Sequence, residues 1–185
     1  MADDSSSDLS GKKVAVLVDN YFEEDEFTGP IKALRAAGAQ VDVIAAEPEN
    51  GKVQSLRHVD KSDRYDFDKT LDEANIDDYD GLVLPGGAIN ADFLRMQDKA
   101  REWARHAVEQ GKPLAAICHA PWLLVSAGIA RGRRLTSFFT IQDDMRDAGA
   151  DWLDEEVVID GTIITSRDPN DVPAFNKALI CMLAA

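Results

Sequence analysis

The sequence contains only two cysteines, Cys118 and Cys181, and no apolar run that approaches the 18 residues of a membrane-spanning segment. Two cysteines are too few for the disulfide framework of a small secreted domain. The first residues are acidic and rich in serine, without the apolar stretch of a signal peptide. We therefore expect a cytoplasmic protein that does not bind membranes and whose thiols stay reduced.

Positive charge is also scarce. Against 20 lysines and arginines stand 34 aspartates and glutamates, which gives a formal net charge of −14. Proteins that bind nucleic acid need clustered basic side chains for phosphate contacts, so this composition argues against a nucleic-acid partner.

Histidine occurs only three times, at His58, His106 and His119. None of the three has a metal-ligand spacing relative to the cysteines, so the sequence predicts no metal site. We expect His58, in a polar loop, and His106, on a surface-facing helix, to be structural.

Short buried strands alternate with helical segments along the chain, which predicts an α/β fold with a mostly parallel sheet and helices on both faces. The length of 185 residues suits one domain, which we place at 12–185 after a disordered tail at 1–11. Strands are expected at 12–20, 40–47, 81–87, 112–118 and 134–138, around 56–59 and 65–67, and as a hairpin at 157–166; helices are expected at 26–37, 98–110, 119–128, 141–148 and 172–184.

One junction between a strand and a helix carries a thiol beside an imidazole, in the sequence AAICHAP. Cys118 ends the strand, and Ala116 and Ala120 supply the small residues that a nucleophile elbow needs two positions before and after the nucleophile. Pro121 fits the first turn of a helix. The N–H groups at the start of this helix are expected to lower the pKa of the Cys118 thiol. The alternative is a core cysteine, which is what we expect of Cys181.

Two other strand ends meet the same edge of the predicted sheet. The sequence LPGG lets the backbone approach a ligand, so its N–H groups can form an oxyanion hole, although the motif alone also fits a plain turn. The acidic run at 23–26 fits either a solvated helix start or an acid beside the thiol. Such an acid must mostly keep its proton, because adjacent negative charges repel.

Taken together, these motifs resemble the DJ/PfpI superfamily, which is related in fold to the class I glutamine amidotransferases. The similarity covers 12–183 and is closest to the PfpI-like branch, which includes bacterial general stress proteins. It implies a flavodoxin-like α/β sandwich. The motifs that carry the resemblance are NYFEEDEF, LPGG, NADFLR, AICHAP, LLVSAGIARGRRLTS, the stretch 143–167 and the closing helix.

The resemblance also implies roles for individual residues. Cys118 is expected to be the nucleophile, with His119 in support. Glu23 is expected to be the acid that touches the thiol, in preference to Glu24. The resemblance implies an oxyanion site near His119, formed by the backbone of Gly86, Gly87 and Ala88.

A further implied residue is Asp92, which in PfpI-like oligomers corresponds to an acid that reaches a histidine of the neighbouring subunit. The archaeal proteases have glutamate at this position, and the aspartate found here makes a protease-type triad less secure. The resemblance implies a homo-oligomer, a dimer or a hexamer. Trp122 replaces a more polar residue of some relatives and is expected to change the shape of the pocket. Arg167 and Asp168, which follow the last strand, are secondary candidates for its border.

Three functions fit these residues. The first, which we favour, is a cofactor-free glyoxalase or deglycase, in which the Cys118 thiolate attacks a reactive carbonyl and Glu23 or His119 moves protons. The second is a cysteine peptidase or amidase that acts on peptides and uses Asp92 as partner; side chains of adjacent residues at an elbow point apart, which argues against a productive pair with His119. The third is a redox-responsive stress protein or chaperone, in which Cys118 is oxidised to a sulfinate.

Overall fold

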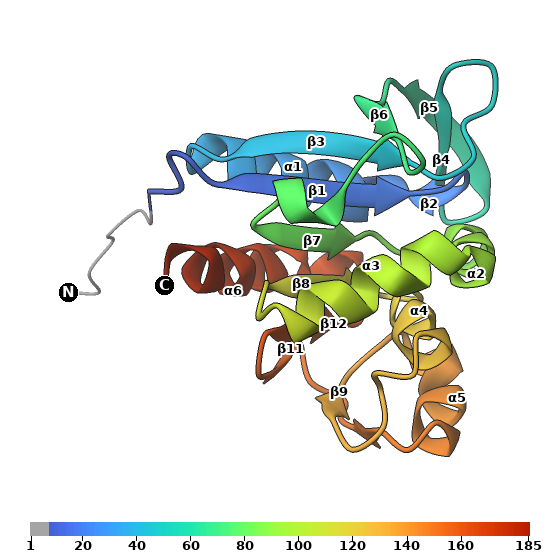
Figure 1. Cartoon of the computed structure of the whole chain (residues 1–185). Helices are drawn as coiled ribbons and strands as arrows, with labels where there is room; N and C mark the ends of the chain where they lie inside the picture. Colours follow the sequence, from blue (N-terminus) through green and yellow to red (C-terminus); the bar gives the residue numbers. More distant parts are fainter. Residues whose placement is uncertain (1–7) are drawn as a thin grey trace.

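A seven-stranded sheet runs through the middle of the molecule in this computed structural model, which describes residues 8–185 (Figure 1). All neighbouring strands of the sheet pair in parallel except the first two, which form an antiparallel hairpin. The predicted α/β class and mostly parallel sheet are therefore confirmed. The order of the strands is β11 (Val157–Asp160), β12 (Ile163–Ser166), β8 (Leu114–Ile117), β7 (Gly81–Leu84), β1 (Lys13–Val18), β3 (Gln40–Ala45) and β6 (Lys69–Thr70).

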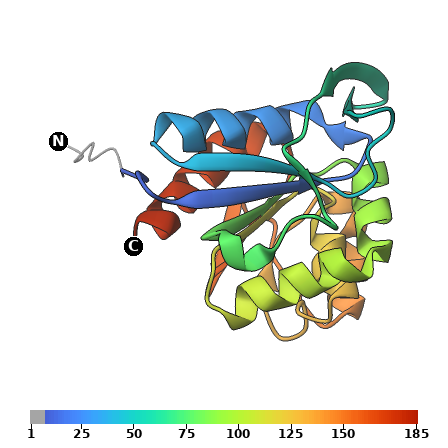
Figure 2. The ribbon, with the colours of Figure 1, turned by 45° about the horizontal axis from the view of Figure 1, so that its top comes forward.

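Helices cover both faces of this sheet, as Figure 2 shows with α1 and α3 on opposite sides. One core lies under α1 (Glu24–Ala36) and α6 (Val172–Ala184). The second lies under α2 (Ala88–Met96), α3 (Asp98–Glu109), α4 (Pro121–Ser126) and α5 (Gln142–Asp147). The strands read as continuous apolar runs because successive side chains enter the two cores in turn. In β8, Leu114 and Ala116 pack on one side, and Ala115 and Ile117 on the other.

A smaller sheet stands at the carboxyl ends of the central strands. It consists of β2 (Phe22–Glu23), β4 (Val53–Arg57) and β5 (Asp60–Tyr65), and the last two form a hairpin. Because β2 leads directly into α1, the start of that helix lies against the hairpin. The remaining short elements are β9 (Arg134–Leu135), β10 (Asp151–Trp152), η1 (Ile76–Asp78), η2 (Phe139–Ile141) and η3 (Pro169–Asp171).

The amino-terminal segment differs from the predicted disordered tail at 1–11. Residues 1–7 lie outside the described part of the chain. Leu9 is fully buried, and its N–H donates to the carbonyl of Ala37 at 2.7 Å. The prediction is therefore wrong for residues 8–11, which contact the domain.

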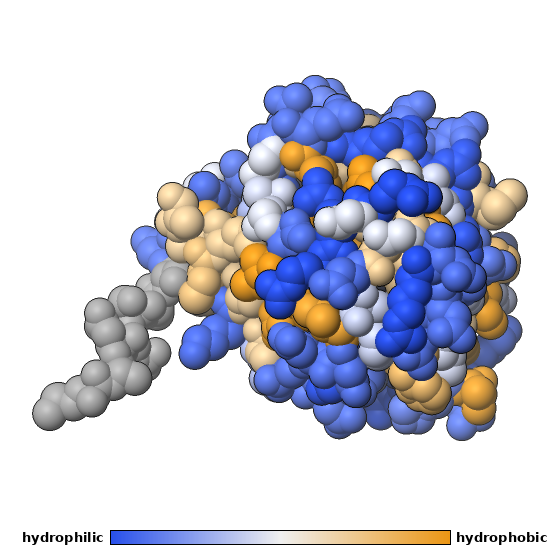
Figure 3. Space-filling view, turned by 90° about the horizontal axis from the view of Figure 1, so that it is seen from below, coloured by the Kyte–Doolittle hydropathy of each residue, from blue (hydrophilic) through white to orange (hydrophobic). Residues whose placement is uncertain are grey.

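The helix α2 is an element that the sequence did not predict. Of the strand predicted around 56–59, Leu56 and Arg57 form the end of β4, and His58 and Val59 form the turn to β5. No helix in residues 8–185 has the length and hydropathy needed to cross a membrane. Figure 3 shows one face of the molecule, where small patches of hydrophobic residues lie between hydrophilic ones.

Candidate active site

A cavity of about 780 Å³ lies at the carboxyl edge of the sheet. Its wall combines the start of α1, the turn of the β4–β5 hairpin, the loop after β7, the end of β8 and the loop after β12. In parallel sheets this edge is the usual place for ligands, because the loops that follow the strands converge there. The cavity contains both residues of the predicted nucleophile motif, Cys118 and His119.

Cys118 lies between β8 and α4 with a φ of 64°, in the left-handed region that few residues other than glycine adopt. Backbone hydrogen bonds hold it on both sides. Its N–H donates to the carbonyl of Ser166 at 3.0 Å, and its carbonyl accepts from the N–H of Phe138 at 2.7 Å. The thiol is thereby fixed between two loops that belong to different parts of the sequence.

Gly86 brings the loop after β7 against this turn. A Cβ at this position would lie 2.6 Å from the Cys118 Cβ and 2.2 Å from the Glu26 Oε2, so only glycine fits. The Gly86 N–H donates to that oxygen at 2.9 Å. The prediction that Gly86 donates to an oxyanion is therefore wrong, because its N–H is already bonded.

The next two residues line the cavity, as an oxyanion site requires. The backbone N–H groups of Gly87 and His119 lie near the Cys118 sulfur and lower the pKa of the thiol. Gly87 and Ala88 both belong to the cavity wall. Their use as oxyanion donors stays a prediction.

The acid that contacts the thiol is Glu26, and the prediction of Glu23 is wrong. Glu26 is 0% exposed, and its carboxyl group lies beside Cys118 where both pack against Gly86, so that it raises the pKa of the thiol. Its Oε1 has no hydrogen-bond partner in the part of the chain described here. Glu23 precedes α1 in an extended conformation, which directs its side chain elsewhere.

The helix pattern contained the signal for Glu26. Because α1 begins at Glu24, Glu26 lies one turn before Pro30 on the buried stripe that also carries Phe27, Ile31 and Leu34. A carboxylic acid on the apolar stripe of a helix is costly to bury without a partner. The expectation of Glu23 came from the resemblance and took no account of this spacing.

The protonation of this pair follows from its burial. Burial raises the pKa of the Glu26 carboxyl well above its usual range, and the charge of Glu23 raises it further, so Glu26 keeps its proton at neutral pH. Burial also raises the pKa of the Cys118 thiol, and repulsion by an ionised Glu26 adds to this, while the N–H groups of Gly87 and His119 lower it. The expected lowering by backbone dipoles is therefore present, but burial outweighs it.

His119 reaches its neighbour, contrary to the sequence argument that the two side chains point apart. Its Nδ1 lies 3.1 Å from the Cys118 Sγ, and its Nε2 lies 3.3 Å from the hydroxyl of Thr140. The ring stacks on Phe138 and meets the edge of Trp122. Burial lowers the pKa of His119, so the imidazole is neutral at neutral pH and can accept a proton.

Glu23 and His58 form a second part of the wall. The N–H of His58, in the turn of the β4–β5 hairpin, donates to the Glu23 carboxyl at 3.0 Å. Burial raises the pKa of Glu23. Glu23 therefore holds the hairpin against the cavity, and His58, expected to be structural, belongs to the cavity wall.

Glu24 binds side chains on both strands of the same hairpin. It is 2% exposed and accepts hydrogen bonds from Ser62 at 2.9 Å, from Tyr65 at 2.7 Å and from Arg57. Burial alone would raise the pKa of Glu24, but the bonds from Tyr65, Arg57 and Ser62 lower it to about 2. Of the acidic run, only Asp25 is exposed, so the solvated helix start is not what the structure shows.

Other predicted residues lie outside the cavity. Asp92 is exposed on α2 and is not part of the wall, so its contact with a neighbouring subunit stays a prediction. Arg167 forms ion pairs with Asp171 and Asp154 and does not line the cavity, whereas its neighbour Asp168 does. Cys181 is exposed, so the expectation that it packs in the core is wrong.

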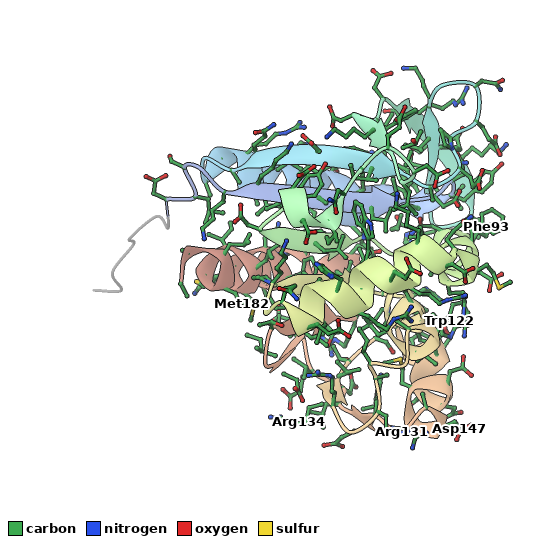
Figure 4. All side chains as sticks on the ribbon, viewed as in Figure 1. Phe93, Trp122, Arg131, Arg134, Asp147 and Met182 are labelled. Carbon is green, nitrogen blue, oxygen red and sulfur yellow. The ribbon has the colours of Figure 1, made fainter. Side chains whose placement is uncertain are left out.

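Trp122 shapes the surroundings of His119 from the side of α4. Its Nε1 donates to Asp144 at 2.8 Å, and the Arg95 guanidinium lies over its ring. Figure 4 shows Trp122 at the same end of the molecule as Phe93 of α2. Trp122 does not itself line the cavity.

Comparisons with known proteins agree with this architecture. The chain is 42% identical over 175 residues to protein/nucleic acid deglycase 2 of Escherichia coli, covering 94% of this chain and 99% of that one. It is 39% identical over 174 residues to general stress protein 18 of Bacillus subtilis, covering 94% of this chain and 98% of the relative.

A solved structure and a family model extend the agreement. The crystal structure of DJ-1beta from Drosophila melanogaster matches with a TM-score of 0.85 at 30% identity, over 94% of this chain and 90% of that one. The model of the DJ-1/PfpI family matches residues 12–182. The chain belongs to the DJ-1/PfpI family.

Proposed function

We propose that the protein is a cysteine-dependent enzyme that acts on small reactive carbonyls or on early glycation adducts, without a cofactor. The observation that carries this proposal is the contact of one thiol with both a protonated acid, Glu26, and a neutral base, His119, inside a cavity. The relative named a deglycase supports the substrate class.

In the first step the Cys118 sulfur attacks the aldehyde carbon of methylglyoxal. The thiol proton passes to the Nδ1 of His119, which lies 3.1 Å from the sulfur, and the carbonyl oxygen receives a proton from the Glu26 carboxyl. The product is a hemithioacetal, in which the new bond joins sulfur to carbon. We propose that the N–H groups of Gly87 and Ala88, two residues of the cavity wall, stabilise the oxygen as its charge develops.

The next steps move protons within the adduct. A base removes the hydrogen from the carbon bonded to sulfur, giving an enediol, and a proton returns to the neighbouring carbon. The resulting thioester is hydrolysed by water, which releases lactate and restores the thiol. The net reaction adds one water to methylglyoxal, and no external oxidant or reductant is needed.

The decisive experiment compares lactate formation from methylglyoxal by the wild type and by Cys118→Ser. We expect the substitution to lower the rate by at least about a hundredfold, because it removes the nucleophile. Cys181→Ser is the matched control, since it removes an exposed thiol on α6 and should leave the rate unchanged. Lactate formation that does not depend on Cys118 would overturn the proposal.

The contact between Cys118 and His119 also favours a second candidate, a peptidase or amidase. A thiol within 3.1 Å of an imidazole has the pairing that cysteine peptidases use. The acid of such a triad would have to come from Asp92 of a neighbouring subunit. Proteolysis of an unfolded protein substrate that is lost in Asp92→Ala would favour this function over the first.

A further inference from the structure

The imidazole of His119 has a hydrogen-bond partner on each of its two ring nitrogens, and both partners belong to the same chain. Its Nδ1 lies 3.1 Å from the Cys118 sulfur, and its Nε2 lies 3.3 Å from the hydroxyl of Thr140. The proposed reaction uses only the first of these contacts. The second occupies the side of the ring on which the acid of a catalytic triad holds its histidine, opposite the nucleophile.

The segment that carries Thr140 is attached to the elbow and to the core. The N–H of Phe138 donates to the carbonyl of Cys118 at 2.7 Å, and the Phe138 ring stacks on the imidazole with the ring centroids 4.8 Å apart. Ile141, the last residue of η2, is 2% exposed and belongs to the core under α4 and α5. An anchored backbone therefore holds the Thr140 hydroxyl within reach of the imidazole.

Two aromatic rings fix the plane of the imidazole, but they do not decide which of its edges faces the thiol. Phe138 stacks on it, and Trp122 meets it at an interplanar angle of 60°. The Nε1 of Trp122 donates to Asp144 and is not available to the imidazole. A half-turn of the imidazole within this aromatic frame would place ring carbons against both the sulfur and the Thr140 hydroxyl. Both hydrogen bonds would then be lost, so the two polar partners together set the orientation.

The position of the ring proton follows from the surroundings of the sulfur. The backbone N–H groups of Gly87 and His119 already lie near the Cys118 sulfur. The sulfur therefore has donors beside it, and Nδ1 is left to accept the thiol proton. A neutral imidazole carries one N–H, which then lies on Nε2 and faces the oxygen of Thr140.

We propose, on the basis of the proposed function, that Thr140 is a positioning residue for His119. Its hydroxyl oxygen accepts the Nε2–H and thereby keeps Nδ1 directed at the thiol. When the sulfur attacks the carbonyl carbon, the thiol proton moves to Nδ1, and the ring becomes a cation with an N–H on both nitrogens. The bond from Nε2 to Thr140 is then charge-assisted, so it stabilises the transition state more than the resting enzyme.

A hydroxyl acts on the imidazole differently from a carboxylate. A carboxylate at Nε2 would favour the imidazolium before any substrate has reacted, and it would raise the pKa of the ring. The hydroxyl of Thr140 carries no charge, and burial lowers the pKa of His119. The imidazole thus stays neutral at neutral pH and can accept the thiol proton, without an acid from a neighbouring subunit.

The reactivity of Cys118 tests this arrangement without turnover. In a Cys181→Ser background, the Cys118 sulfur displaces iodide from iodoacetamide, and its proton passes to the imidazole. Thr140→Val replaces the hydroxyl by a methyl group of similar size at an exposed position, and we expect alkylation at neutral pH to become about tenfold slower. Thr140→Ser keeps a hydroxyl and should react within about twofold of the unsubstituted protein.

A double-mutant cycle shows whether Thr140 acts through His119. In the His119→Ala background the ring is absent, so Thr140→Val should no longer change the alkylation rate. Thr162→Val is the matched control. It makes the same chemical change beside Ile163, which pairs with Leu114 at the opposite end of β8 from Cys118, and it should leave the rate unchanged.

Turnover of methylglyoxal gives a second measurement. Thr140→Val should lower kcat by about tenfold and leave KM within about twofold, because the hydroxyl acts on the charge that develops in the transition state. An unchanged alkylation rate in Thr140→Val would overturn the inference. So would a loss that persists in the His119→Ala background, or an equal loss in Thr140→Ser.

The failure of this inference can be told apart from the failure of the proposed function. If lactate formation depends on Cys118 while Thr140→Val is alkylated like the unsubstituted protein, the inference fails and the proposed function stands. If Thr140→Val slows alkylation only when His119 is present, but no lactate forms even with the wild type, the proposed function fails and the positioning of His119 by Thr140 stands.

Discussion

At the scale of the residue, the chemistry of the site depends on one buried carboxylic acid. Glu26 contacts a backbone N–H through one oxygen and the Cys118 thiol through its carboxyl group. Glutamine in its place could still accept the N–H of Gly86 and could donate a hydrogen bond to sulfur. It could not transfer a proton to the substrate. Substitution by glutamine therefore separates proton transfer from positioning.

We expect Glu26→Gln to lower kcat with methylglyoxal by about a hundredfold with little change in KM. Glu23→Gln is the informative comparison, because Glu23 holds the hairpin and does not touch the thiol. Its effect should be smaller and should fall on KM. Steady-state kinetics of both variants test the assignment, and a larger loss of kcat in Glu23→Gln would contradict it.

The sequence indicated the nucleophile but not its acid, and the difference has a physical cause. Cys118, His119 and the glycines are recognised by local spacing around one turn. Glu23 was expected from the resemblance alone. Glu26 reaches the thiol because its helical spacing places it with Phe27 and Pro30 on the buried face of α1, a face that is known only once the helix packs on the sheet.

At the scale of the element, the β4–β5 hairpin is held against the cavity by Glu24. Arg57, Ser62 and Tyr65 of the hairpin donate to this one buried carboxylate, and Ser55 of β4 adds a longer bond of 3.4 Å. Arg57 lies next to His58, whose N–H is bound by Glu23. Glu24 and Glu23, at the start of one helix, thus fix the strands and the turn of the hairpin, respectively.

We expect Glu24→Gln to destabilise the protein by about 3 kcal/mol, because it leaves Arg57 without its charged partner and weakens two hydrogen bonds. Hydrogen exchange of the β4 and β5 amides should accelerate more than that of the central strands. Glu102→Gln, on the exposed side of α3, is the control and should change neither quantity. Uniform acceleration over the whole sheet would contradict a local role for Glu24.

The same hairpin shows why some elements could not be predicted. The central strands were found because their side chains are buried on both faces and form unbroken apolar runs. β5 has the sequence DKSDRY, without an apolar pattern, and is ordered by a hairpin with β4 and by bonds to Glu24, which lies 38 residues before Ser62 in the sequence. In α2, Ile89, Phe93 and Met96 are exposed, so the apolar residues do not mark the buried side of the helix.

At the scale of the whole molecule, the burial of a carboxyl group makes stability depend on pH. Asp19, at the end of β1, is 2% exposed, and its Oδ2 has no hydrogen-bond partner within residues 8–185. Burial is the main cause that raises its pKa from 3.8 to about 6. The folded protein therefore holds this proton more tightly than the unfolded chain does.

It follows that the contribution of Asp19 to stability is complete below pH 3.8 and is lost as the pH rises to about 6. The loss amounts to about 3 kcal/mol. We expect the stability of Asp19→Asn relative to the wild type to increase by this amount between pH 4 and pH 7, as measured by urea unfolding at several pH values. A relative stability that is constant over this range would show that Asp19 titrates alike in the folded and unfolded chains.

The acid, the glycine and the thiol of the site come from three segments, and the first two alone are 60 residues apart in the sequence. Each segment follows a different strand of the parallel sheet. No fragment that ends before β8 contains the reacting sulfur, and no partly assembled sheet can bring the three groups into contact. During synthesis, the chain should therefore acquire its catalytic activity late and all at once, when the last strands dock.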